Sequence, residues 1–61
     1  MILKDGRLLM VITEGAMKGR IGTIEPFPEG GRTVQVELSG SAIMKSHDQL
    51  RRVTKDDLIV L

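Results

Sequence analysis

The chain alternates apolar and polar residues without exception over residues 33–38, which read TVQVEL. This period of two is typical of a β-strand that buries one side and exposes the other. Residues 8–12, LLMVI, instead form a continuous apolar run between Gly6 and Gly15, too short for a stable isolated helix. We therefore predict one strand at residues 33–38 and another at residues 7–13.

Short β-favouring segments and turn residues alternate along the middle of the chain. Residues 21–25 predict a strand that stops at Pro26, because a proline cannot donate a hydrogen bond to a continuing ladder. A turn is expected at residues 28–31, PEGG, where proline and glycine favour the required backbone angles. A second turn at residues 39–41 leads into a further strand at residues 42–46.

The C-terminal part of the chain predicts a turn, a brief strand and a tail. Residues 47–50 are too few for an α-helix and suit a single tight turn, followed by a brief strand near Val53. Within residues 54–61, Thr54 and Asp57 have the spacing of a helix capping box, but only four apolar residues follow and two are β-branched. We predict a terminal strand or an ordered tail there.

Together these elements predict an all-β fold. Several short strands at even spacing, with turns between them and no helical period, are typical of a small closed or nearly closed β-barrel, here of about five strands. A chain of 61 residues forms one domain, and domains of this size bury only about 60% of the surface of the unfolded chain. We therefore expect a single domain over residues 1–61, without a large catalytic cleft.

The composition excludes several kinds of site. With no cysteine the chain forms no disulfide, and with one histidine, His47, it cannot build a zinc site of the usual nitrogen and sulfur type. Asp48 follows His47, but sequence neighbours rarely orient one another as a catalytic base and its partner must. We expect no enzymatic activity, no catalytic residue, no metal and no cofactor.

Charge and apolar runs limit the partners. Nine basic and eight acidic residues leave a net charge of +1, so any binding to nucleic acid has to come from local clustering of cations. Phe27 is the only aromatic residue, which disfavours sequence-specific RNA recognition by base stacking. No apolar run approaches the roughly 20 residues of a membrane helix, and the first residues lack the pattern of a signal peptide. We expect a soluble, cytoplasmic protein with no membrane contact.

The segment EGAMKGRIGTIE is the candidate functional stretch. It spans residues 14–25 and contains three glycines and two cations: Gly15, Gly19, Gly22, Lys18 and Arg20. A phosphate-binding P-loop ends in Gly-Lys-Ser/Thr, a dinucleotide loop reads G-x-G-x-x-G, and both lead into a helix, so neither pattern fits this segment. The glycines instead favour positive φ angles and close strand approach at a barrel corner, Gly22 above all.

The order of these features resembles the KOW motif, found in NusG-type transcription elongation factors and in several large-subunit ribosomal proteins. The pattern in those families is a strand, a glycine-bearing loop, a key glycine that enters the next strand, and a third, alternating strand. Gly22 takes the place of the key glycine, and Lys18-Gly19 resembles the Lys-Gly pair common in ribosomal members. The similarity covers roughly residues 7–53 and leaves residues 54–61 as the terminal strand or tail.

The resemblance implies an SH3-like barrel of about five strands, with a short 3-10 turn before the last strand. Alignment on Gly15 turns six apolar side chains inward: Met10, Ile12, Ile24, Val34, Val36 and Leu50. Strand alternation then sends Leu9 and Val11 outward, where they form an apolar strip and a candidate protein interface. We expect the terminal segments to cover this strip; the alternative is a second copy or a partner protein.

The cations of the glycine-rich loop are the candidate contacts. Loops of ribosomal KOW relatives touch nucleic-acid phosphates, which implies this role for Lys18 and Arg20; the alternative is a solvated loop. Residues around the turn before the last strand would extend the rim: Lys45, His47, Arg51 and Arg52. Met17, at the loop tip, is either a plug of the barrel or an exposed contact for a protein partner. Phosphate contacts of this kind are sequence-independent and salt-sensitive.

The function expected from these features is that of a non-enzymatic binding module. Its partner would be RNA polymerase, the ribosome or a nucleic-acid backbone within a transcription or translation assembly. The alternative is a small accessory or self-assembling subunit, held by a protein partner or as a homo-oligomer, with no nucleic-acid role, because one fold serves many functions.

Overall fold

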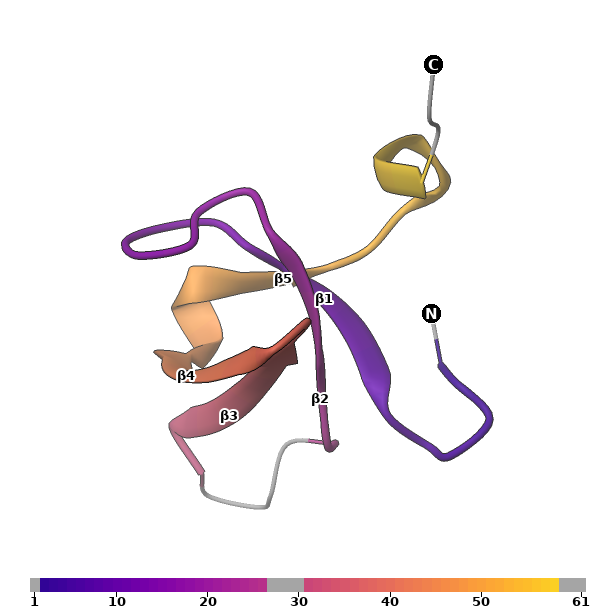
Figure 1. Cartoon of the computed structure of the whole chain (residues 1–61), viewed down its shortest axis with the longest axis horizontal. Helices are drawn as coiled ribbons and strands as arrows, with labels where there is room; N and C mark the ends of the chain where they lie inside the picture. The colour runs from indigo at the N-terminus through magenta and orange to yellow at the C-terminus, as the bar shows by residue number, and fades with distance from the viewer. Residues whose placement is uncertain (1, 27–30, 59–61) are drawn as a thin grey trace.

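Five antiparallel strands form one sheet in the order β4-β3-β2-β1-β5, seen in a computed structural model that describes residues 2–26 and 31–58 (Figure 1). The strands are β1 (Leu8–Ile12), β2 (Ile21–Ile24), β3 (Thr33–Leu38), β4 (Ser41–Ser46) and β5 (Leu50–Arg52). The sheet curls into a half-barrel, so the predicted all-β class is confirmed and the arrangement is that expected of a small SH3-like barrel.

The strands follow the sequence pattern closely. A short 3-10 turn, η1 (His47–Gln49), precedes β5, where a tight turn is predicted. Among the described residues β4 pairs only with β3 and β5 only with β1, so the sheet stays open between these two edge strands. The turn predicted at residues 28–31 falls largely outside the described residues.

The core occupies the inner face of the curled sheet. Along β3 the side chains alternate between exposed and buried, as the strict polar–apolar alternation predicts. Eight buried residues form one cluster: Leu8, Met10, Ile12, Ile24, Val34, Val36, Leu38 and Leu50. The six side chains predicted to point inward all belong to this cluster. Burying each aliphatic side chain stabilises the fold by roughly 1.5–3 kcal/mol, which is the main favourable term in a domain without disulfides.

Gly22 lies on β2, at a position where the strand packs closely against β3. A Cβ atom at this position would stand 2.5 Å from Val36 Cγ1 and 2.8 Å from the Glu37 carbonyl oxygen. Its φ is not positive, unlike those of Gly15 and Gly19, so Gly22 is required by close strand approach alone. The prediction that this glycine serves barrel geometry is confirmed.

The outer apolar strip is only partly open. Alternation along β1 puts Leu9 and Val11 on the face away from the core, as predicted, but Val11 is 6% exposed and Leu9 half-buried. Val53, which donates its N–H to the Leu9 carbonyl at 3.3 Å, is equally well buried. Val11 is therefore not an exposed interface residue, and this part of the prediction is wrong.

The cover of the strip predicted from the chain ends falls partly outside the described residues. Ile2, which forms a bridge with Leu8, is 67% exposed, and Leu58 is 42% exposed. Residues 59–61, the rest of the predicted cover, lie outside the described residues. The described parts of the termini therefore leave their own apolar side chains largely in solvent.

Of the predicted terminal strand or ordered tail, the described part contains no strand and forms a second 3-10 turn, η2 (Lys55–Leu58). Asp57 accepts hydrogen bonds from the Thr54 N–H at 2.7 Å and from Thr54 Oγ1 at 3.0 Å, so the capping-box spacing does start a turn. Arg51 Nη1 and Nη2 each donate to Asp57 at 2.8 Å and tie η2 to β5. The Arg51 and Thr54 hydrogen bonds hold the pKa of Asp57 well below its usual value of 3.8.

Acid is expected to release η2 from β5. A carboxyl whose pKa is lowered by folding stabilises the folded state above the pKa of the unfolded chain, and this contribution is lost as the pH falls from that value through the lower pKa of the folded state. Because the folded-state pKa of Asp57 lies well below 3.8, the Thr54 amide chemical shift should stay unchanged at about pH 4 and move only at more acidic pH in ¹⁵N NMR spectra. Asp57→Ala, which removes the acceptor, should give the released Thr54 signal already at neutral pH; a wild-type signal in that variant would contradict the assignment.

Candidate functional site

The glycine-rich segment forms the loop between β1 and β2, residues 13–20. At its base, Gly19 N–H donates to the Ile12 carbonyl at 2.7 Å and Ile12 N–H donates to the Arg20 carbonyl at 3.0 Å. These two bonds extend the antiparallel pairing of β1 and β2 beyond the strands themselves. The loop therefore projects from a closed, ladder-like stem at one end of the half-barrel (Figure 1).

The tip of this loop consists of two successive tight turns. Lys18 N–H donates to the Gly15 carbonyl at 3.2 Å, and Arg20 N–H donates to the Met17 carbonyl at 3.0 Å. Gly15 and Gly19 have φ of 75° and 89°, while Met17 has a φ of 67° although it carries a side chain. Such a conformation is costly for a residue with a Cβ and marks the tip as a locally strained point.

Lys45 anchors the loop from the neighbouring edge strand. Its side chain is 5% exposed, and Nζ donates a 2.7 Å hydrogen bond to the Glu14 carbonyl. Thr13 N–H donates to the Gln49 carbonyl in η1 at 2.9 Å, which is a second hydrogen bond between the loop and the β4–η1 segment. The expectation that the turn before the last strand lies near the loop is thus confirmed.

The prediction of Lys45 as a surface contact is wrong. On β4 this residue stands opposite Val34, a core residue of β3, so its side chain points inward. The aliphatic stem crosses apolar surroundings and only the ammonium group reaches a polar acceptor, the usual behaviour of a buried lysine. Lys45 is two residues after Ile43 on β4, and residues i and i+2 of a strand point to the same face. Because Ile43 packs on the core, this spacing is the sequence signal that would have predicted a buried Lys45.

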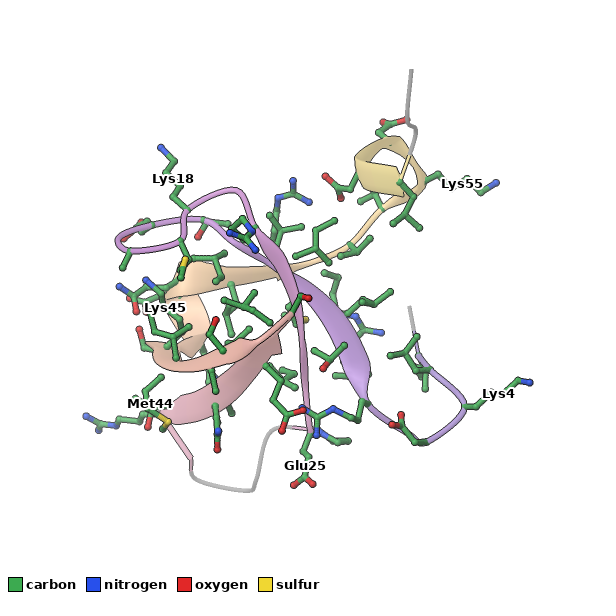
Figure 2. All side chains as sticks on the ribbon, viewed as in Figure 1. Lys4, Lys18, Glu25, Met44, Lys45 and Lys55 are labelled. Atoms are coloured by element: carbon green, nitrogen blue, oxygen red, sulfur yellow. The ribbon has the colours of Figure 1, made fainter. Side chains whose placement is uncertain are left out.

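Lys18 and Arg20 are exposed at the loop, as predicted. Neither side chain forms a salt bridge or hydrogen bond with another described residue, and Lys18 extends away from the half-barrel (Figure 2). Met17 is 40% exposed beside them and does not plug the barrel. The tip therefore displays two uncompensated positive charges and one adaptable apolar side chain.

The remaining predicted contacts do not join this tip as one patch. Arg51 and Arg52 are successive residues of β5, which point to opposite faces of a strand. Arg51 is engaged by Asp57 in a bidentate ion pair, and Arg52 is exposed. Only Lys18 and Arg20 are therefore held together by a common loop.

The turn η1 beside the loop is ordered by its own polar contacts. Ser46 N–H donates to Gln49 Oε1 at 3.1 Å, and His47 N–H donates to the Arg32 carbonyl at 3.1 Å. Ser46 Oγ donates to Asp48 Oδ1, so this carboxylate helps to order the turn. The contribution of Gln49 to the loop and to this turn was not foreseen from the sequence.

No protein-family model, curated protein or solved structure matches the chain. Within residues 2–26 and 31–58, no three histidine, aspartate or glutamate side chains gather as metal ligands. Across those same ranges, no helix has the length and apolar character needed to cross a bilayer. The candidate site therefore rests on the geometry of the loop tip and its two cations.

Proposed function

We propose that the chain is a non-enzymatic, cytoplasmic binding module whose β1–β2 loop contacts nucleic-acid phosphates within a transcription or translation assembly. The observation that carries this proposal is the loop tip itself. Lys18 and Arg20 are exposed, lack internal partners among the described residues, and stand on a loop fixed by the Lys45 and Gln49 ties. The resemblance of the sequence to the KOW motif supports the same reading.

A loop whose backbone is held in place favours phosphate binding, because little backbone freedom is lost when its cations meet the ligand. Phosphate contacts made by side chains alone carry no sequence information and release counterions, so the affinity falls as salt rises. For two contacts on duplex nucleic acid, the slope of log K against log salt concentration is about −2. We therefore expect weak, sequence-independent and strongly salt-dependent binding.

The competing function is that of a small accessory or self-assembling subunit without a nucleic-acid role. Two exposed methionines favour it, Met17 at the loop tip and Met44 on β4, which are 40% and 60% exposed. Methionine side chains adapt easily to apolar partners and are common at protein interfaces. A chain with this function would elute as an oligomer or co-purify with a defined protein.

A titration with a random-sequence RNA or DNA duplex, followed by ¹⁵N NMR, tests the proposal. The amides of Lys18 and Arg20 should shift at low salt and return as salt is added. Replacing both residues with alanine should remove the binding. Lys4→Ala is the control for the loss of a surface charge, because Lys4 is an exposed cation far from Lys18 (Figure 2).

The outcome separates the two functions. Loop shifts that vanish in the double variant and persist in Lys4→Ala support phosphate binding. Equal loss in Lys4→Ala would mean that only net charge matters, and would refute a specific loop site. Absence of any shift, with elution as an oligomer, would favour the accessory subunit.

A further inference from the structure

A second surface lies at the other end of β2, on the outer face of the sheet. A groove of about 360 Å³ is formed there by residues before β1, after β2, and along β3 and β4. The residues that matter for its chemistry are Arg7, Glu25, Gln35, Glu37 and Met44. Figure 2 shows Glu25 and Met44 at the opposite end of the half-barrel from Lys18. The groove is therefore separate from the loop tip.

Arg7 is the only cation among the described residues that line the groove, and its side chain already has partners. Arg7 Nε donates to Thr23 Oγ1 at 3.2 Å and Nη2 donates to the Thr23 carbonyl at 3.0 Å. The same guanidinium lies 3.4 Å from Glu37 Oε2 and 3.9 Å from Glu25 Oε1. The side chains of Glu25 and Glu37 nevertheless stay 84% and 57% exposed. The two accessible carboxylates carry one more charge than the single arginine neutralises, so these groove residues have a net negative charge.

An apolar side chain stands beside these carboxylates. In the β3–β4 register, Met44 pairs with Gln35, and Glu37 is two residues from Gln35 on the same face of β3. Diagonal neighbours of this kind are about 7–8 Å apart. Residues i and i+2 of an extended chain point the same way and lie about 6.6 Å apart. The groove thus offers an anionic and an apolar contact at the repeat of an extended peptide.

We propose that this groove docks an extended peptide segment of a partner protein, with arginine or lysine at one position and an apolar residue two positions later. The cation meets Glu37 and Glu25, and the apolar side chain meets Met44. Nucleic acid is disfavoured at this surface because the exposed charges are negative.

Within the described residues, a second copy of the chain offers the groove no exposed pair in this order. Sequences with a cation two residues before an apolar residue occur at Arg7, Arg32 and Arg51 within the described residues. The apolar residues of these pairs are Leu9, which is half-buried, and Val34 and Val53, which are buried. Their side chains are held by the fold and are not available to another molecule.

The test uses three short acetylated and amidated peptides with the folded chain. The probe is Gly-Arg-Thr-Leu-Gly; the first control, Gly-Arg-Leu-Thr-Gly, moves the leucine next to the arginine, and the second, Gly-Glu-Thr-Leu-Gly, reverses the charge. We expect the probe to shift the Gln35 and Glu37 amides and the Met44 methyl signal in NMR spectra, and to bind more tightly than either control. Equal binding of all three peptides would overturn the proposal.

Variants of the groove sharpen the result. Glu37→Gln should weaken the probe about two- to five-fold, the range for one exposed ion pair. Asp56→Asn is the matched control, since Asp56 is an exposed carboxylate outside the groove. Equal weakening in both variants would overturn the site. If the NMR signals of the groove residues shift with protein concentration when no peptide is present, the groove binds a second copy of the chain, and the peptide proposal is refuted. Loop residues take no part in this test, so its outcome is independent of the proposed phosphate contact.

Discussion

Replacing Gly22 with alanine is expected to destabilise the fold by about 3 kcal/mol, at the upper end of the range for overpacked sites. The added Cβ would stand 2.5 Å from Val36 Cγ1, 2.8 Å from the Glu37 carbonyl oxygen and 2.9 Å from Leu38 Cδ2. The carbonyl oxygen belongs to the β3 backbone and cannot move without disturbing the pairing of β2 with β3. Folds of this length have total stabilities of about 3–9 kcal/mol, so much of the variant should be unfolded.

Gly40→Ala is the matched control for this change. A Cβ at Gly40 would meet nothing within 4 Å, and the cost comes only from its φ of 79°. That conformation costs a residue with a Cβ about 1 kcal/mol. Urea and thermal denaturation measure both variants. Equal losses at the two positions would show that β2 and β3 do not approach as closely as the Gly22 contacts require.

Replacing Lys45 with methionine is expected to cost about 1.5 kcal/mol and to loosen the β1–β2 loop. Methionine keeps an unbranched stem in the core but cannot donate to the Glu14 carbonyl, so the change isolates the 2.7 Å tie. A hydrogen bond from a charged donor contributes roughly 1.5–3 kcal/mol, and relief from burying an ammonium group offsets part of that loss. Hydrogen exchange of the Gly19 amide, bonded to the Ile12 carbonyl, should accelerate.

Lys18→Met provides the same chemical change at an exposed position of that loop. Substitutions at such sites usually stay within about 0.5 kcal/mol, and the Gly19 amide should keep its protection. If Lys45→Met were as neutral as Lys18→Met in both stability and exchange, the Glu14 tie would have no role in holding the loop.

The local pattern of apolar, polar and glycine residues was sufficient to predict most of the fold. The alternation over β3 determined which of its side chains face the core, because one face of that strand is buried and one is wet. Close approach at Gly22 followed from a glycine at the start of a short strand. In both cases the deciding interaction involves neighbours in a regular sheet, where sequence spacing translates directly into position.

The errors have a common physical origin in contacts between distant residues. Lys45 was assigned to the surface by its charge, but its strand parity and the Glu14 carbonyl place it inside. The 3-10 turn within the predicted strand or ordered tail was not foreseen either, because the bidentate Arg51–Asp57 pair that helps to hold it joins residues of different elements. Long side chains that reach a polar acceptor across the fold leave no periodic signal in the sequence.

The way the β1–β2 loop is anchored has a consequence for how the chain could evolve. Lys45 Nζ donates to the carbonyl of Glu14, and the carbonyl of Gln49 accepts from the N–H of Thr13. Both hydrogen bonds therefore involve main-chain atoms of the loop. Most side chains of the loop can therefore be exchanged without releasing it. Gly15 and Gly19 are exceptions, because their φ angles of 75° and 89° strain any residue with a Cβ, and a Cβ at Gly15 would also stand 2.9 Å from Lys45 Nζ. The half-barrel thus provides a constant frame on which mutation or grafting can change the exposed loop residues while the register of the strands is kept.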